Sequence, residues 1–323
     1  MKEFLYFKIK NIKLYNPHIT TMKLAHISDI HFSRLISDQK LEAILHELKQ
    51  NQPDYIMVTG DNVDHNNVLE NQDHKNRFLE FHKQLANLAP TFEIFGSHDF
   101  SYHQSQNPHW FYQWNEEWLG ELDKVENLYI MRDQIITGEE FRIIGFNHPW
   151  NYYHVKDTRI EDKYALIQDL NNNFPNTEKN PYFPVIKDDK CNILLAHSPI
   201  FILDPEVQQN THILKHMDMI MTGHMHNGMI PPILDELITN SKGLFAPNKS
   251  LFPNNTRGII PYKQPTGKIT NLCISGGITK LQETAPTILH PFKNIYPMSL
   301  DFYHLSKLHQ KAPQQKAYYK KAQ

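Results

Sequence analysis

The sequence predicts an α/β fold in which helices cover a largely buried sheet, and three observations lead to this prediction. Short runs rich in Ile, Val, Leu, Phe and Met are bounded by turn-forming residues, which favours buried strands. Segments with helical periodicity separate several of these runs. Each run ends in polar residues that could carry chemistry. The five runs are LAHISDIHF (24–32), DYIMVTGDNVD (54–64), TFEIFGSHDF (91–100), NILLAHSP (192–199) and MDMIMTGHMHNG (217–228).

Helices and further strands complete this pattern along the chain. Between the first two runs, Leu41, Ile44 and Leu48 fall at helical spacing after a cap at Ser37 or Asp38. Alternation of strands and helices is typical of a sheet whose faces are covered by helices. The other expected elements are helices over 76–88 and 161–171 and strands within 141–150 and 270–279.

The composition favours a globular cytoplasmic protein and argues against a nucleic-acid-binding protein. With 323 residues, 40% of them hydrophobic, the chain can bury a substantial core. A net charge of -2 makes a nucleic-acid partner unlikely, because such binders usually carry a basic excess. Cys191 and Cys273 lie in separate apolar stretches, which predicts buried thiols and a reducing compartment. The chain shows neither a membrane-length apolar run nor the pattern of a signal peptide, so we expect a cytoplasmic protein.

The polar ends of the five runs form a candidate metal site. In open α/β sheets, ligands gather beyond the carboxyl ends of the strands, so these ends should meet at one rim. Asp-x-His and His-x-His each occur once, and residues i and i+2 of an extended segment project to the same side. Carboxylate and imidazole donors without cysteine suit Mn²⁺, Fe²⁺ or Zn²⁺ rather than a structural zinc finger. The candidates are Asp29, His31, Asp61, His98, His197, His224 and His226.

Each motif also has a purely structural interpretation. With 20 histidines in the chain, one His-x-His is weak by itself, and Asp29 could simply cap a turn. His98 and Asp99 could form a surface turn. A His-Asp pair also binds metal from a helix in some phosphohydrolases, but Gly96 and the β-rich run before it argue against a helix here. Repetition of one design in five runs favours the functional interpretation.

In this order, SDIH, GDNVD, GSHD, LLAHS and GHMHNG resemble the motifs of the calcineurin-like metallophosphoesterases. The segment 243–262 and the run CISGGIT are similar to those of the bacterial YkuE and YaeI type of phosphoesterase. The resemblance implies a four-layer fold, with two mixed β-sheets packed face to face and helices outside. It also implies two divalent metal ions, Mn, Fe or Zn, at the strand ends.

Carried over to this chain, the resemblance assigns a role to each candidate. Asp29, His31 and His226 would hold the first metal, His197 and His224 the second, and Asp61 would bridge them. His98 would lie beside the metals without ligating them and would protonate the leaving group. Asp99 would orient His98, and Asp64 would support the loop that carries Asp61.

The implied activity is hydrolysis of a phosphodiester, pyrophosphate or phosphomonoester bond by a metal-bridging hydroxide. The substrate would be a small molecule or a lipid-linked phosphoester, such as an envelope lipid or a sugar nucleotide. A nuclease is a weaker option, because no basic stripe lies near the motifs.

Ser97 departs from the family pattern, which has asparagine as a ligand of the second metal. A serine hydroxyl is shorter and is a weaker neutral donor, so Ser97 could reach the second metal only through water, and we expect a loosely held second metal. If the backbone shifts, Ser97 could instead ligate the metal directly and leave activity intact. The alternative function is a metal-binding scaffold with weak catalysis.

We expect a single domain over residues 1–323, with the motif core at 24–228 and C-terminal strands to about 282. Two of the insertions are rich in aromatic residues, which could line a substrate pocket or belong to the core. These aromatic residues are Trp110, Trp114, Trp118, Tyr152, Tyr153 and Tyr164. The expected insertions lie near 101–118, 150–185 and 235–265, and a basic tail covers 303–323.

Both ends of the chain are basic and partly apolar. Lysines alternate with apolar residues near the N-terminus, and the tail after Asp301 carries lysines without acids. Such ends could bring the protein into peripheral contact with an anionic membrane. A solvated tail and an edge strand are the alternative.

Overall fold

The structure of the protein is a computed structural model. The residues that it describes are 5–64, 66–99, 116–147, 160–174, 186–200, 202–235, 237–238, 241–245, 251–264, 266–281, 287–292, 294–308 and 314–322.

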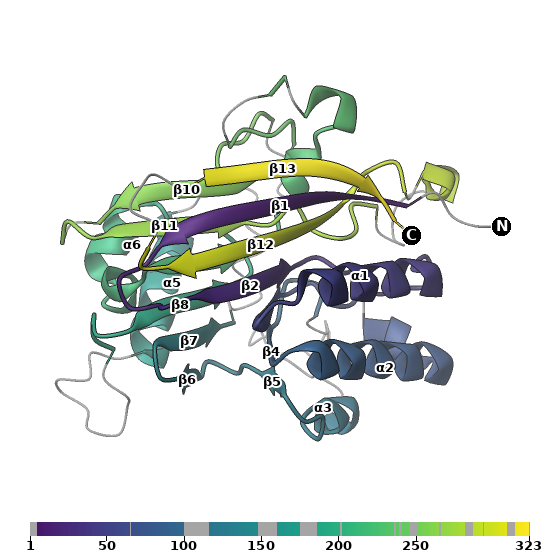
Figure 1. The fold of residues 1–323 in the computed structure, drawn as a ribbon, viewed down its shortest axis with the longest axis horizontal. Helices are drawn as coiled ribbons and strands as arrows, with labels where there is room; N and C mark the ends of the chain where they lie inside the picture. Colours follow the sequence, from purple (N-terminus) through teal and green to yellow (C-terminus); the bar gives the residue numbers. More distant parts are fainter. Residues whose placement is uncertain are drawn as a thin grey trace.

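Two mixed β-sheets form the centre of the molecule, as the family resemblance implied (Figure 1). The first sheet has the strand order β13-β1-β12-β2-β3-β4-β5. Its strands β2 to β5 run parallel, whereas β12 pairs antiparallel with β2 and β13 pairs antiparallel with β1. The strands are β1 (Tyr6–Tyr15), β2 (Met22–Ile27), β3 (Tyr55–Thr59), β4 (Thr91–Ile94), β5 (Leu128–Ile130), β12 (Met298–Ser306) and β13 (Gln314–Lys321).

The second sheet has the order β10-β11-β9-β8-β7-β6. Its four central strands run parallel, and antiparallel strands form both edges. Parallel strands put their carboxyl ends on one rim. The strands are β6 (Ile135–Thr137), β7 (Phe141–Phe146), β8 (Cys191–Ala196), β9 (Met219–Thr222), β10 (Gly258–Lys263) and β11 (Ile269–Ile274).

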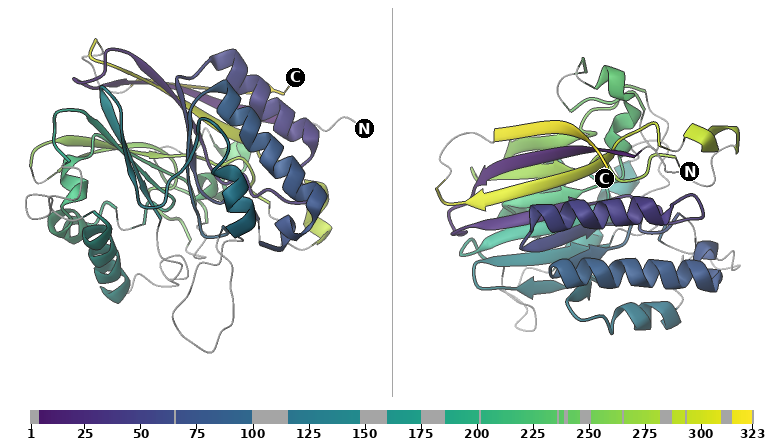
Figure 2. Two further views of the ribbon diagram at one scale, coloured as in Figure 1. Left: turned by 90° about the horizontal axis from the view of Figure 1, so that it is seen from below. Right: turned by 45° about the vertical axis from the view of Figure 1, so that its right-hand side comes forward.

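Helices cover the outer faces of both sheets (Figure 2). The helices α1 and α2 start at side-chain caps, because Ser37 accepts a hydrogen bond from the Lys40 N–H and Asn71 accepts from Asp73 and His74. The helix predicted over 76–88 begins four residues earlier, at this Asn71 cap. The α-helices are α1 (Asp38–Asn51), α2 (Gln72–Leu88), α3 (Glu116–Leu122), α5 (Ile160–Asn173) and α6 (Pro205–Asn210). Short 3₁₀ helices are η1 (Asn66–Glu70), η3 (Ile213–His216), η4 (His226–Met229), η5 (Pro232–Leu234) and η6 (Thr287–Phe292).

Three apolar clusters hold the four layers together. Side chains of β8 alternate between two of them: Ile193 and Leu195 pack between the sheets, and Leu194 packs against the helices α5 and α6. The third cluster joins the first sheet to α1, α2 and α3. A strand buried on both faces must be apolar throughout, which is why the runs were recognisable in the sequence.

Both ends of the chain lie in the first sheet, where β1 pairs with β12 and with β13. Lys8 forms an ion pair with Asp235, and Lys10 lies 2.9 Å from Asp301. We expected strands only to about residue 282 and a basic tail over 303–323, but β12 and β13 lie beyond 282, and residues 303–306 and 314–321 of the expected tail are strand. Alternation of lysine with apolar residues near the N-terminus therefore reflects a strand with two different faces.

Both cysteines are buried free thiols, as expected. Among the residues that the structure describes, every helix is too short or too polar to span a lipid bilayer.

A buried ion pair links α2 to the strand that leads into the candidate site. His82 Nε2 lies 3.1 Å from Glu93 Oε2, and both side chains are excluded from solvent. Burial alone lowers the pKa of His82, but Glu93 outweighs this effect and the pKa is raised. The stabilisation is therefore fully present below the unfolded-state pKa of about 6.5 and is lost as the pH rises through the folded-state pKa.

We predict that Glu93→Gln lowers the free energy of unfolding by about 3 kcal/mol at pH 6, because it removes one partner of a buried pair. The deficit should shrink as the pH rises to 9. Urea unfolding at several pH values measures it. Glu80→Gln, at an exposed position of α2, the helix that carries His82, is the control, with a change within about 0.5 kcal/mol. A deficit that grows with pH would contradict the assignment.

Candidate metal centre

The predicted site residues follow five strands that end at one rim. Asp29 and His31 follow β2, Asp61 follows β3, His197 follows β8, and His224 follows β9; these five side chains are at least nine-tenths buried. The partly exposed His98 follows the fifth strand, β4. The sequence prediction thus brought the correct strand ends together.

The backbone at the ligand positions differs from our expectation. We expected Asp29 and His31 to project to one side of an extended segment, as we did His224 and His226. All four instead have positive φ angles, between 46° and 65°. Left-handed turns after the strands, and not strand alternation, aim these side chains into the site. Asp and His tolerate this backbone region better than most residues, and such strain is common at functional sites.

Asp29, His31, Asp61 and His226 form a first cluster, in which one ligand atom from each residue lies within 4.8 Å of the others. Asp29 Oδ1 is 3.7 Å from His226 Nε2, and Asp61 Oδ2 is 3.6 Å from His31 Nε2. Both distances are too long for hydrogen bonds and leave room for a cation between the atoms.

Asp61, His197 and His224 form a second cluster within the same distance limit. His197 Nε2 lies 3.2 Å from Asp61 Oδ2 and 3.2 Å from His224 Nδ1. The carboxylate of Asp61 therefore belongs to both clusters, which is the position that a bridging ligand would occupy.

Neighbouring backbone carbonyls orient two of the histidines. His197 Nδ1 lies 2.7 Å from the carbonyl oxygen of Thr59, and His226 Nδ1 lies 3.1 Å from that of Thr279. Since a carbonyl only accepts, Nδ1 of each ring carries the proton and Nε2 faces the cluster. We had assigned the run CISGGIT to a strand and turn without predicting that Thr279 supports the site. Its only sequence signal was the glycine turn.

His98 lies beside the clusters and is partly exposed. Its Nδ1 is 2.5 Å from the carbonyl oxygen of Asp64 and 3.8 Å from the carboxylate of the same residue. The backbone N–H of His98 donates to Asp61 Oδ1 at 2.8 Å. Asp64 Oδ1 is also 3.6 Å from His31 Nδ1, so Asp64 lies between these two rings.

Asp99 has a different set of contacts from the one we expected. Its carboxylate accepts hydrogen bonds from the backbone N–H groups of Asn62, Val63 and Gly96, at 2.8, 3.0 and 2.7 Å. These contacts fasten the turn after β4 to the turn after β3. The backbone carbonyl of Asp64 holds His98 Nδ1, the role that we had predicted for Asp99.

Ser97 points at the shared carboxylate. Its Oγ lies 3.2 and 3.3 Å from the two oxygens of Asp61. The hydroxyl therefore lies next to the second cluster, where it donates a hydrogen bond to Asp61.

Glycines let the turns approach one another closely. A Cβ at Gly96 would lie 2.2 Å from the Asp61 backbone nitrogen and 2.8 Å from the His197 ring. A Cβ at Gly223 would lie 1.7 Å from Ser28 Oγ. Side chains at these positions would push the ligand-bearing turns apart.

Two observations show that the residues fit divalent cations. Among the described residues, neither ring nitrogen of the buried His31 has a hydrogen-bond partner, which is costly unless another group satisfies it. Carboxylate and imidazole donors also form a set that suits ions such as Mn²⁺, Fe²⁺ and Zn²⁺.

The charge distribution also favours a cation. Burial alone raises the pKa of Asp61, but His197 and His98 outweigh it and the pKa falls well below its usual range. Burial lowers the pKa of His197, yet Asp61 raises it to about 9. Burial and His197 keep the pKa of His224 well below its usual range. Positive charge is thus stabilised beside Asp61, where a metal would replace the proton.

Two mixed sheets with carboxylates and imidazoles at their strand ends define the class of metal-dependent phosphoesterases. The model of the calcineurin-like phosphoesterase family matches residues 22–228. The chain therefore belongs to the calcineurin-like phosphoesterases.

The similar proteins are distant. An uncharacterized metallophosphoesterase of Aquifex aeolicus is 21% identical over 66% of this chain and 66% of its own length. The putative phosphoesterase 078R of Invertebrate iridescent virus 3 is 26% identical over 39% of this chain and 35% of its own length. The chain thus spans less than two thirds of either relative.

One solved structure with similarity is described as GAP50, the anchor in the inner membrane complex of Plasmodium. The two sequences are 12% identical, and the superposition covers 94% of this chain and 89% of the GAP50 chain with a TM-score of 0.45. A likeness of this extent carries no argument about function.

Of the aromatic residues predicted in the insertions, Tyr164 is half exposed on α5. The side chain of Trp118 lies outside the described residues. Trp110, Trp114, Tyr152 and Tyr153 also lie outside them.

We predict that Gly96→Ala weakens Mn²⁺ binding by about 10- to 100-fold, because the new methyl group displaces Asp61 and His197. Calorimetric titration with Mn²⁺ measures the affinity. Gly120→Ala in α3 is the matched control: among the described residues outside its own helix backbone, a Cβ there meets no atom within 4 Å, so metal affinity should not change. It should add about 0.5–1 kcal/mol of stability, as expected for this change in a helix. Equal metal affinity in both variants would rule out the packing argument.

Proposed function

We propose that this protein is a hydrolase of phosphate esters that uses two divalent metal ions. The position of Asp61 in both ligand clusters carries the proposal, because one carboxylate serves two cation sites only where the ions are adjacent. Family membership supports the reaction class.

Each residue of the site has a role in this reaction. Asp29, His31 and His226 would hold one ion, His197 and His224 the other, and Asp61 both. Bound ions would supply positive charge to the phosphate oxygens. They would also lower the pKa of a water molecule, so that hydroxide could attack phosphorus. The buried donors position that charge without reorganisation during the reaction.

His98 is the residue that we assign to proton transfer. The carbonyl of Asp64 fixes the proton on Nδ1, so Nε2 is the atom that would meet the leaving oxygen. Its side chain is 29% exposed, the only one in its cluster with His31 and Asp64 to reach solvent. A substrate arriving from solvent would therefore meet His98 at the rim of the site.

We predict that His98→Ala lowers kcat for bis-p-nitrophenyl phosphate with Mn²⁺ by about 10²–10⁴-fold, through loss of the proton donor. Release of p-nitrophenol measures the rate. The metal content should stay the same, because His98 is outside both bridging clusters. A wild-type rate no faster than that of the variant would favour the scaffold function over catalysis.

We also propose that Ser97 leaves the second ion loosely held. Its hydroxyl donates toward Asp61, and as a short neutral donor it would hold an ion more weakly than an asparagine amide oxygen would. Ser97→Asn is expected to raise the bound Mn²⁺ per chain and the phosphodiesterase rate. Elemental analysis after dialysis gives the stoichiometry, with Thr137→Asn, at an exposed position of β6, as a control for the added amide. If neither quantity rises in S97N, the loose-site proposal is wrong.

We also propose the substrate class, the subtype, the identity of the ions and the location of this protein. A lipid-linked or sugar-nucleotide substrate and relation to the YkuE and YaeI type rest on the similarity of 243–262. The identity of the ions, a cytoplasmic location and peripheral contact with anionic membrane also rest on the sequence. Lys8 and Lys10 are buried in ion pairs, so membrane contact would depend on exposed lysines such as Lys316 and Lys321.

A further inference from the structure

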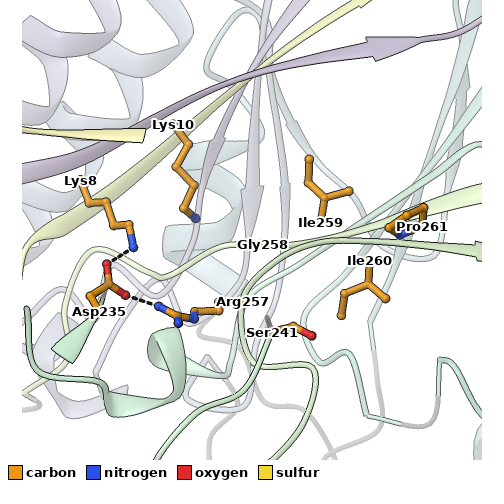
Figure 3. A pocket seen from close by; sticks show the side chains of 9 residues that line it. All are labelled: Lys8, Lys10, Asp235, Ser241, Arg257, Gly258, Ile259, Ile260 and Pro261. Carbon is orange, nitrogen blue, oxygen red and sulfur yellow. Dashed lines mark hydrogen bonds and ion pairs between the residues drawn. The ribbon is translucent and has the colours of Figure 1, made fainter. Parts of the chain in front are cut away.

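A second cavity lies at the open edge between the two sheets, apart from the metal ligands. Its volume is about 460 Å³, within the range of small-molecule sites. Figure 3 shows Lys8 and Lys10 of β1 on one side and residues of β10 on the other. None of the described residues that line it belongs to the candidate metal centre.

Three cationic side chains of this cavity are withdrawn from solvent. The side chains of Lys8, Lys10 and Arg257 are 11%, 3% and 9% exposed. Buried charges are costly unless they are paired, so their partners decide whether a ligand has a place here.

Two carboxylates serve these three cations. Lys8 and Arg257 both form ion pairs with Asp235, which also accepts a hydrogen bond from the hydroxyl of Tyr319 at 2.5 Å. Lys10 pairs with Asp301 at 2.9 Å. Among the described residues of this cluster, positive charge therefore exceeds negative charge by one.

The titration of Lys8 agrees with an excess of positive charge. Burial lowers its pKa, and Lys10 lowers it further. The ion pair with Asp235 raises the pKa but does not restore its usual value. An anion beside Lys8 and Lys10 would relieve this repulsion.

The opposite side of the cavity is suited to an apolar group. Ile259, Ile260 and Pro261 line it. At Gly258 the backbone has a φ of 80°, and no described residue beyond its chain neighbours has an atom within 4 Å of where a Cβ would stand, so there is open space beside Arg257.

We propose that this cavity binds a monoanionic phosphodiester-like group with a short apolar substituent. Its negative charge would match the single excess positive charge. Arg257 and the two lysines would contact the phosphoryl oxygens, and the Ile259–Pro261 side would contact the substituent. A soluble metabolite and a lipid headgroup share this chemistry. The site is independent of the proposed hydrolysis at the metal centre.

Calorimetric titration of the full chain, loaded with Mn²⁺, tests the proposal with hexyl methylphosphonate as the probe. His197→Ala disables the metal centre and is preferred to a change at His226, because the adjacent Asn227 contacts Asp235 at 3.4 Å. Arg257→Gln disables the cavity. The matched control is Lys8→Arg, which keeps the charge.

We expect wild type and His197→Ala to retain a common binding event that Arg257→Gln weakens at least about tenfold, by loss of a charge-assisted hydrogen bond. Lys8→Arg keeps the positive charge and should therefore lose less affinity than Arg257→Gln does. Methyl methylphosphonate, which lacks the longer apolar chain, should bind more weakly than the hexyl compound. No binding to wild type, or equal binding to Arg257→Gln, would overturn the proposal.

Three further measurements distinguish the possible outcomes. If Arg257→Gln does not fold, hydrogen exchange of the wild type must show slower exchange in 258–263 with the probe, and no change there overturns the proposal. Sedimentation with phosphatidylglycerol vesicles then separates a lipid headgroup from a soluble ligand. Parallel turnover of bis-p-nitrophenyl phosphate by Arg257→Gln should stay within about twofold of wild type, so failure at the cavity is distinct from failure of the hydrolase.

Discussion

The sharing of the Asp61 carboxylate between two ligand clusters is the constraint on which the rest of the site depends. To reach both clusters, Asp61 must stand where the end of β3 in the first sheet faces the end of β8 in the second. The 2.7 Å contact between His197 Nδ1 and the Thr59 carbonyl fixes this approach across the two sheets. The four-layer packing therefore serves the site directly, because a shift of one sheet against the other would separate His197 from Asp61.

The ligand-bearing turns of the two sheets lie so close together that ordinary side chains and backbone angles would clash. The sequence avoids these clashes in two ways. Glycines at 60, 96 and 223 remove Cβ atoms that would collide with ligand-bearing turns. Aspartate and histidine occupy positive-φ positions that most side chains avoid. Asp99 then offsets the loss of regular backbone pairing by accepting three backbone N–H groups from the turns. Burial of Asp99 and the nearby charge of Asp61 raise the pKa of Asp99 to about 8. Both effects disfavour a negative charge on Asp99.

The two ends of the chain form a separate structural unit around Asp235. Lys8 of β1, Tyr319 of β13 and Arg257 before β10 all converge on this one carboxylate. The contact of Asn227 with Asp235 links that unit to the loop of His226. Segments that looked like basic extensions thus complete the first sheet and bound the second cavity.

The sequence by itself determined the buried parallel strands, the helices over α1, α2 and α5, and the identities of the metal-ligand candidates. These are local properties: apolar runs, helical spacing, capping residues and polar residues at strand ends are all visible along the chain. Only the tertiary structure decided what depends on distant segments meeting. The left-handed turns at Asp29 and His31, the fastening role of Asp99, the support from Thr279 and the pairing of β1 with β12 and β13 arise from contacts between remote residues. No local pattern encodes such contacts, because their free energy is gained only once the two sheets have packed.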